Sequence, residues 1–303
     1  MLRETCDLLV TNNDGIYVDC TFGGGGHSTE ILKLLSENGR LFAFDCDDAA
    51  LERGAALAES DKRFSLEKGR FSQLKENAER NSISGVDGIT MDLGTSSFQL
   101  FDPERGFSFM RGEDLDMRLD QQQELTAYDV VNGYGEEDLV EIFKTFSDLK
   151  SPYNVAAMIC KRRMSQPFET CSELANFIKT STKAGKVEKK KIHPATQVFQ
   201  AIRMEVNCEL KEIQEGLETA VSLLRTGGRL AVITFHSIED RLVKNYFRQE
   251  NTDCLCNKYQ IVCVCGHTRS VKLITRKPMA PSNEETRENP ASRSAKLRVV
   301  EKL

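Results

Sequence analysis

A strand-like segment that runs into four glycines constrains the fold of this chain more than any other feature. Residues 16–20 read Ile-Tyr-Val-Asp-Cys, and the next seven read Thr-Phe-Gly-Gly-Gly-Gly-His, ending at His27. Apolar residues then recur at helical spacing up to Leu35, and a second strand-like segment, 40–44, ends at Asp45. This order is typical of folds that bind a nucleoside, because the glycines let the backbone approach the ligand and the acid accepts hydrogen bonds from a ribose diol.

The glycine run favours a nucleoside cofactor without a pyrophosphate. Dinucleotide-binding loops space their glycines as Gly-x-Gly-x-x-Gly, which brings a helix N-terminus onto the pyrophosphate. Here residues 23–26 are consecutive glycines, and His27 and Ser28 stand where a third spaced glycine would be. S-adenosylmethionine offers a ribose to Asp45 and an amino-acid tail to the loop. A nucleotide-dependent (NAD-type) oxidoreductase on the same type of sheet, or a plain glycine turn, is the alternative.

Length and composition predict a globular cytoplasmic chain of one large or two modest domains. The 303 residues are 40% hydrophobic, and no apolar run is long enough to cross a membrane. The first six residues do not resemble a secretory signal, so we expect a cytoplasmic location and reduced cysteines. The net charge of −5 argues against a strongly basic, coat-like nucleic-acid binder but not against an enzyme with a local basic face. Monomer and homodimer both stay open.

Alternating strand and helix patterns predict an α/β fold with a mainly parallel sheet covered by helices on both faces. Strands are expected at residues 16–20, 40–45, 63–67 and 88–92. In such sheets the ligand binds beyond the carboxyl ends of the strands. The glycine loop, Asp45, Arg70, Phe71 and Asp92 all follow predicted strands, so we expect them at one edge of the sheet.

A helical insertion is expected after the fourth strand. Residues 95–120 have neither period and contain four phenylalanines, which favours an ordered functional loop over disorder. Residues 121–190 read as helices. We therefore expect a helical insertion at 116–194 between the two parts of a sheet core, 1–115 and 195–303.

The sheet pattern then resumes. A helix with one apolar face is expected at 205–224, ended by Gly227-Gly228. The strand that follows, 229–235, leads to His236, and an apolar alternation from Ala295 predicts an edge strand.

Asp92 is the candidate catalytic residue, in the stretch Met91-Asp-Leu-Gly-Thr-Ser-Ser-Phe-Gln99. The exocyclic amine of cytosine or adenine is a poor nucleophile because its lone pair is delocalised into the ring. An acceptor that pulls on the N–H localises the pair for attack on a methyl group. Amine methyltransferases usually follow this acidic or polar residue with Pro-Pro and an aromatic, which are absent here. A cofactor-binding role or a simple strand cap for Asp92 therefore stays open.

Interleaved cations and aromatic rings are candidate RNA contacts, because rings stack on unpaired bases and Arg pairs with phosphates. The predicted RNA-contact residues are Arg105, Phe107, Arg118, His193, Arg203 and His236. A packed loop with an internal Arg–Asp pair is the alternative for the first three. Two basic runs, Lys183 to Lys191 and the stretch from Arg269 onward, are either further RNA contacts or solvated surface.

Four cysteines form a late cluster, Cys254-x-Cys256 and Cys263-x-Cys265. Zinc sites usually use Cys-x-x-Cys, whose extra residue lets both thiolates reach one ion. We therefore expect plain thiols and no bound metal, with zinc or an oxidation-prone pair as the alternatives.

Seven stretches of the sequence together resemble one family. They are residues 17–28, 91–99, 104–111, 115–120, 193–203, 233–241 and 289–298. The chain resembles, nearly end to end, the bacterial small-subunit ribosomal RNA cytosine-N4 methyltransferases known as RsmH or MraW. The resemblance implies a class I S-adenosylmethionine-dependent methyltransferase with a Rossmann-like sheet and a helical insertion. It further implies a target cytosine in the decoding centre of 16S rRNA, within the small ribosomal subunit.

The same resemblance assigns the cofactor positions. They fall on Gly25, Gly26, His27, Asp45, Phe71, Asp92 and Gln99. The sequence departs from the family at two places: family members usually carry a His-x-Pro-Val segment ahead of the residues that match Met1–Glu4, and usually Arg or Lys at the position of Gly24. A non-catalytic RNA-binding module, with RNA affinity indifferent to cofactor, is a third interpretation.

Overall fold

Two compact units make up the protein in a computed structural model. It describes residues 1–109, 112–181, 193–257, 259–260 and 262–303. The first unit is formed by Met1–Gly94 with Leu210–Leu303, and the second by Thr95–Glu209. The expected insertion, 116–194, lies inside the second unit, whereas Arg111 and the basic run from Lys183 to Lys191 lie outside the described residues.

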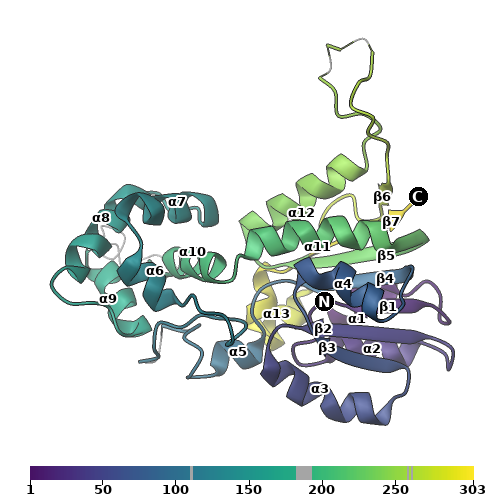
Figure 1. Cartoon of the computed structure of the whole chain (residues 1–303), viewed down its shortest axis with the longest axis horizontal. Coiled ribbons are helices and arrows are strands. Elements are labelled where there is room, and N and C mark those ends of the chain that lie inside the picture. Colours follow the sequence, from purple (N-terminus) through teal and green to yellow (C-terminus); the bar gives the residue numbers. More distant parts are fainter. Residues whose placement is uncertain (110–111, 182–192, 258, 261) are drawn as a thin grey trace. The chain divides into compact units, whose positions relative to one another are not determined.

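The first unit is built on a seven-stranded sheet in the order β3-β2-β1-β4-β5-β7-β6 (Figure 1). The strands are β1 (Ile16–Asp19), β2 (Arg40–Asp45), β3 (Phe64–Lys68), β4 (Val86–Asp92), β5 (Leu224–Thr234), β6 (Val271–Leu273) and β7 (Lys296–Lys302). The first five strands pair in parallel, and β7 pairs antiparallel with both β5 and β6. This topology confirms the predicted α/β fold with a mainly parallel sheet.

Helices cover both faces of this sheet. The helices of this unit are α1 (Leu2–Leu9), α2 (Gly26–Leu34), α3 (Asp48–Ser60), η1 (Phe71–Gln73), α4 (Leu74–Arg80), α11 (Glu209–Leu223), α12 (Ser237–Glu250), α13 (Asn283–Glu288) and η3 (Pro290–Ser294). Along β5, Leu230 and Val232 enter a core with α4, α11 and α12, while Ala231 and Ile233 enter a second core with α1, α2 and α3. This alternation of two buried faces is the period-2 pattern of a strand covered on both sides.

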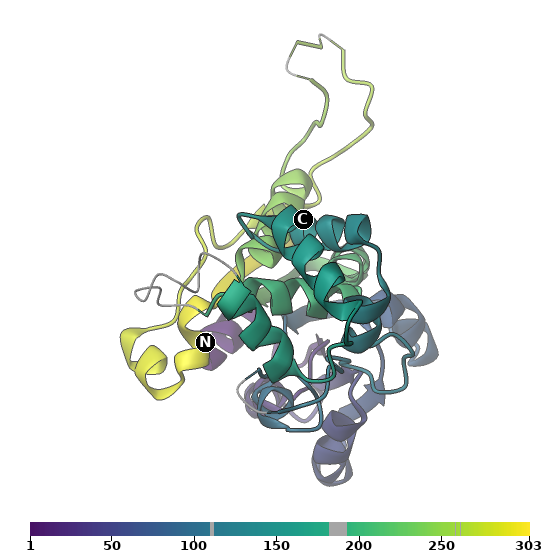
Figure 2. The ribbon, with the colours of Figure 1, turned by 90° about the vertical axis from the view of Figure 1, so that its left-hand side faces the viewer.

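The second unit is helical (Figure 2) and has a hydrophobic core of its own. Its helices are α5 (Ser97–Phe101), α6 (Ala127–Gly133), α7 (Glu136–Phe146), α8 (Pro152–Arg163), α9 (Cys171–Ser181) and α10 (Thr196–Val206). Leu139, Phe143, Leu174 and Ile178, at the helical spacing seen in the sequence, are buried in this core. In the part of the chain that the structure describes, no helix has the length and apolar character needed to cross a membrane.

Three expectations about the late elements were wrong. The expected helix at 205–224 begins only at Glu209, because Cys208 takes a positive φ of 51°. The amide of Asn207 fixes this break, since it accepts from the N–H of Leu119 and donates to the carbonyl of Met117.

The other two corrections concern the sheet. Gly227 and Gly228 do not end a helix but lie inside β5, where Gly227 has a φ of +84°. The final strand β7 is not at the edge, because it lies between β5 and β6. The short β6 forms that edge instead.

Candidate active site

The glycine loop joins the end of β1 to the start of α2. Gly25 is the N-cap of α2 and has a φ of +77°, a backbone conformation that favours glycine. A Cβ on Gly25 would come within 2.7 Å of the ring of Phe22, so a side chain is excluded there for a second reason. Gly26 has nothing within 4 Å of the position that a Cβ would take. The loop thus leaves open backbone beside the first turn of α2.

Asp45, the last residue of β2, holds this loop in place. Its carboxylate accepts hydrogen bonds from the backbone N–H of Gly23 at 2.7 Å and from that of Asp47 at 2.9 Å. Burial raises the pKa of Asp45 to about 6, although these two N–H groups lower it. The carboxyl predicted to bind a ribose is therefore partly desolvated and already oriented by the loop.

Asp19 is a carboxylate of this edge that was not predicted from the sequence. It is fully buried at the end of β1 and accepts from the hydroxyl of Ser28 at 2.7 Å and from the N–H of Thr21 at 3.1 Å. The hydroxyl of Thr21 in turn accepts from the N–H of Asp92 at 2.8 Å. The sequence feature that could have revealed Asp19 is an acid at the end of a predicted strand, directly before the glycine loop.

His27 and Asp92 face each other at the ends of α2 and β4. Nδ1 of His27 lies 3.7 Å from Oδ2 of Asp92. The Asp92 side chain as a whole is 32% exposed, yet its Oδ1 is shielded from solvent and has no hydrogen-bond partner among the described residues. Nε2 of His27 is likewise shielded and without a partner there. Burial raises the pKa of Asp92 to about 6, and the nearby His27 opposes that rise.

Phe71 completes the set that the structure gathers in the first unit. It follows β3, packs partly buried against the core of α4 and α11, and closely approaches Gly216. Gly25, Gly26, His27, Asp45, Phe71 and Asp92 thus all lie beyond the carboxyl ends of β1 to β4. Gln99 belongs to the second unit, where it forms a capping box with Ser96 at the start of α5.

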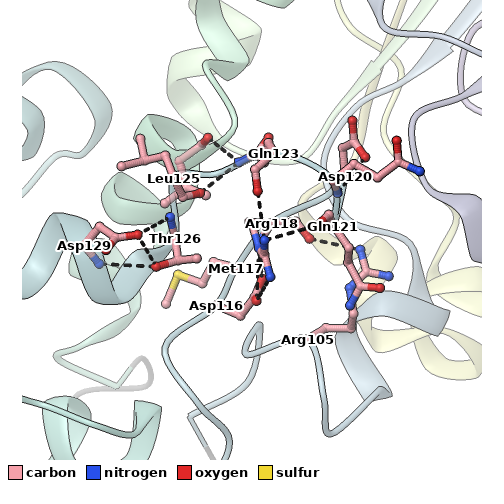
Figure 3. Close-up of polar contacts among 12 residues, drawn as sticks. Arg105, Asp116, Met117, Arg118, Asp120, Gln121, Gln123, Leu125, Thr126 and Asp129 are labelled. Carbon is pink, nitrogen blue, oxygen red and sulfur yellow. Dashed lines mark hydrogen bonds and ion pairs between the residues drawn. The ribbon is translucent and has the colours of Figure 1, made fainter.

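The two predicted RNA-contact arginines near the start of the second unit are engaged internally (Figure 3). Arg105 is 3% exposed and donates from Nη2 to the carbonyls of Arg118 and Leu119, at 2.9 and 2.8 Å. Arg118 forms an ion pair with Asp116 at 2.7 Å and donates to the carbonyl of Gln123 at 2.8 Å. The internal Arg–Asp pair weighed as the alternative is therefore present, and an RNA contact for either arginine stays a prediction.

Other predicted RNA contacts of this unit are also packed or paired. Phe107 is partly buried against the unit's core. The His193 ring lies 4.7 Å from that of Phe109, and Arg203 forms an ion pair with Glu209 at 2.7 Å. The two phenylalanines of α5 are more exposed, Phe98 at 54% and Phe101 at 66%. Their exposure, which the sequence did not reveal, makes them additional candidates for base stacking.

His236 lies at the carboxyl end of β5, where it caps α12. Its Nδ1 accepts from the N–H of Glu239 at 3.4 Å, and the buried Glu239 carboxylate accepts from the N–H of Phe235 at 2.8 Å. This capping role does not exclude an RNA contact, which stays a prediction for His236.

A basic pocket of the first unit was not identified as a site from the sequence. It is lined by Lys244, Phe247, Arg248, Leu273, Thr275, Arg276, Lys277, Pro278 and Arg298. Arg298 is paired with Asp240 at 2.8 Å. The pocket gathers part of the late basic stretch beside α12, which supplies a locally positive surface on a chain with a net negative charge.

Known proteins match this chain along its whole length. The family model described as the MraW methylase family covers residues 1–303. Three relatives are named ribosomal RNA small subunit methyltransferase H. The one from Carboxydothermus hydrogenoformans is 47% identical and covers 100% of this chain and 96% of the relative. Those from Caldicellulosiruptor saccharolyticus and Clostridioides difficile are 45% and 44% identical, each over 100% of this chain and over 98% and 97% of the relative.

Proposed function

Because the chain belongs to the MraW methylase family over residues 1–303, we propose that it transfers a methyl group from S-adenosylmethionine to N4 of a cytosine in the decoding centre of 16S rRNA. The names of its relatives, which are small-subunit rRNA methyltransferases, support the substrate class. The chemistry available at Asp92 supports an exocyclic amine as the acceptor.

The observation that carries the proposal is Oδ1 of Asp92, a shielded carboxylate oxygen with no partner among the residues that the structure describes. A buried polar atom left unpaired costs about 1–3 kcal/mol, and a ligand that donates to it recovers that free energy. The N–H of a cytosine amine is such a donor. Nε2 of His27, also unpaired within the described part of the chain, is a second polar atom available to a ligand at the same edge.

Asp92 has the properties that an amine methyltransferase needs in its acceptor. With a pKa of about 6, its carboxyl is ionised at neutral pH and accepts an N–H strongly. Pulling on that N–H localises the nitrogen lone pair, and the same oxygen is placed to take the proton that the amine loses. His27 and Thr21 orient the Asp92 side chain and backbone.

The first unit fits S-adenosylmethionine, which supplies an electrophilic methyl group on a positively charged sulfonium. Asp45 would bind the ribose, and the open backbone at Gly26 would admit the amino-acid tail. The carboxylates of Asp19, Asp45 and Asp92 lie at one edge of the sheet, and their charge complements a cofactor that carries a sulfonium and an ammonium group.

Two surfaces are proposed to hold the RNA. The basic pocket beside α12 presents Lys244, Arg248 and Lys277 to phosphates. Phe98 and Phe101 are candidates for stacking on unpaired bases, because much of each residue is exposed to solvent. The basic run from Lys183 to Lys191 is proposed to add phosphate contacts.

Methylation of small-subunit RNA by the purified protein tests the proposal. Small ribosomal subunits and free 16S rRNA from a strain without this methyl group would be incubated with labelled S-adenosylmethionine, digested and separated by nucleoside mass spectrometry. We expect N4-methylcytidine with the parent protein and much less with Asp92→Asn. Asp61→Asn, which removes a carboxyl outside the site, is the matched control and should act like the parent.

Two results would contradict the proposal. Methylation at another atom or base would refute the cytosine-N4 assignment but would still support methyltransferase activity. Thermal stabilisation by NAD but not by S-adenosylhomocysteine, with no methyl transfer to any RNA, would favour the oxidoreductase instead.

A further inference from the structure

We propose that Cys254, Cys256, Cys263 and Cys265 bind one zinc ion. They lie in the long connection between α12 and β6, which projects from the sheet unit (Figure 1). One Cys-x-Cys pair comes from the outgoing arm of this connection and the other from the returning arm. The proposal concerns a site outside the methyl-transfer machinery and does not depend on the proposed function.

The four sulfurs converge on one point. All four Sγ atoms lie within 4.8 Å of one another. Sγ of Cys263 is 3.4 Å from that of Cys254, 4.0 Å from that of Cys256 and 3.5 Å from that of Cys265. A tetrahedral zinc ion with Zn–S bonds of about 2.3 Å holds its sulfurs about 3.8 Å apart. The observed separations bracket that value.

Because the four sulfurs converge, the short Cys-x-Cys spacing no longer argues against a zinc site. Cys-x-Cys is unfavourable when both thiolates must reach an ion from one short turn, because Cys-x-x-Cys supplies the extra residue. Here the two arms run back past each other, so Cys254 meets Cys263 and Cys265 across the gap, at 3.4 and 3.7 Å. The sulfur of Cys263 is close to all three others, as expected for four ligands around one ion and not for two separate cysteine pairs.

Backbone N–H groups stabilise thiolates in this cluster. The N–H of Leu255 donates to Sγ of Cys265 and the N–H of Val264 to Sγ of Cys256, both at 3.4 Å. The thiolate is the form of cysteine that binds a metal ion.

None of the described residues in the connection between α12 and β6 is buried. Between α12 and β6 its described residues form no helix or strand. Its larger apolar side chains point to solvent, with Leu255 46%, Val262 70% and Val264 75% exposed. Short segments without a buried core commonly rely on a bound metal or disulfides. Zinc is favoured over iron–sulfur clusters, because sulfurs so close together suit a single ion.

Metal analysis of the full-length protein tests the assignment. The protein would be purified under reducing conditions without chelator, and its zinc and iron measured by mass spectrometry. We expect about one zinc per chain, absent when the four cysteines are changed together to Ser. Cys208→Ser, which removes an exposed cysteine elsewhere, is the matched control and should retain the zinc.

A second measurement does not depend on the quadruple variant folding. Parent protein stripped of metal by chelator and kept reduced would be titrated with Co²⁺. We expect thiolate-to-cobalt charge transfer and the intense visible bands of tetrahedral cobalt, both removed by adding zinc. Cofactor affinity should stay the same with and without metal.

Three results would overturn the zinc site: no metal above background in the chelator-free protein, stoichiometric iron in place of zinc, or a Co²⁺ spectrum without thiolate bands. Two intact disulfides in protein purified under reducing conditions would also overturn it.

Discussion

The backbone N–H of Gly23 donates a 2.7 Å hydrogen bond to Oδ2 of Asp45, so the acid at the end of β2 fixes the loop that follows β1. The two parts of the sequence that first suggested a nucleoside site are thus joined directly. One carboxylate is proposed to bind the ribose and also to hold the loop that receives the rest of the cofactor. Changes at Asp45 should therefore affect both.

Asp45→Ala should weaken binding of S-adenosylmethionine tenfold to a hundredfold. Removing a hydrogen bond to a charged group costs about 1.5–3 kcal/mol, and the unanchored Gly23 would add to that cost. Isothermal titration calorimetry would measure the change. Asp61→Ala, at the amino ends of the parallel strands just before β3, is the control and should bind the cofactor like the parent. Unchanged affinity in Asp45→Ala would remove Asp45 from the site.

The affinity for S-adenosylmethionine should fall as the pH is lowered through 6. Asp45 and Asp92 both have a pKa of about 6, so above that pH both carry the negative charge that attracts the cationic cofactor. Binding measured by calorimetry from pH 5 to 8 should be flat at the alkaline end and weaken on the acidic side. Asp45→Asn should show a shallower dependence, and an identical profile would exclude titration of Asp45 as a cause.

The contribution of Asp45 and Asp92 to the free energy of unfolding should decrease as the pH rises, which is opposite to their effect on cofactor affinity. Their pKa values are raised above the ordinary value of about 3.9, so the native state binds more protons than the unfolded chain between about pH 4 and 6. Their contribution therefore falls as the pH rises through that window. Denaturant unfolding of the parent and of Asp92→Asn should show that the variant loses part of this fall. If the free energy of unfolding changes equally with pH in the parent and the variant, the pKa of Asp92 is not raised.

Asp92→Asn should reduce the single-turnover rate of methyl transfer at least tenfold. The amide keeps the shape of the side chain but is a weaker acceptor for the substrate N–H. The melting temperature should not fall, because the substitution removes a desolvated charge without leaving a cavity. Quenched-flow assays with saturating cofactor and RNA would measure the rate, and a near-parent value would leave Asp92 a passive role.

Changing Lys189, Lys190 and Lys191 to Glu should weaken RNA binding and flatten its dependence on salt. The slope of log affinity against log salt falls by about one unit for every lysine–phosphate interaction that is removed. Filter binding at several salt concentrations would measure both quantities, while cofactor affinity should stay constant.

A matched variant separates a local interaction from a change in net charge. Lys62, Lys75 and Lys211, exposed lysines of the sheet unit, would be changed to Glu together. This control should keep the parent slope. If affinity and slope fall equally in both variants, the basic run makes no specific interaction with RNA.

Much of the proposed cofactor edge was predictable because it is local in sequence. Strand, loop, helix and acid follow one another within about thirty residues, and the carboxyl ends of parallel strands meet at one edge whatever the distant chain does. Asp45 and Asp92 were placed for that reason. The buried Asp19 was missed because a strand that ends on an acid does not reveal whether that acid faces solvent or the loop.

The errors came from long-range contacts. No local pattern shows that β7 pairs between β5 and β6, or that the amide of Asn207 reaches Met117 and Leu119 to break a helix. The arginines of the second unit show the same limit. A sequence gives the positions of the cations but not which of them are already bound to backbone carbonyls, as Arg105 is.

The position of β7 constrains the order in which the protein is made and folded. Residues 296–302 form an interior strand, and β6, synthesised earlier, has its only strand partner among the described residues in β7. During translation the backbone N–H and C=O groups of β5 that pair with β7 therefore stay unpaired until residues 296–302 emerge from the exit tunnel. An open edge invites pairing with other chains, so premature termination upstream of residue 296 should yield aggregating products. The sheet of a protein proposed to modify ribosomes is thus completed only after the residues of β7 have been synthesised.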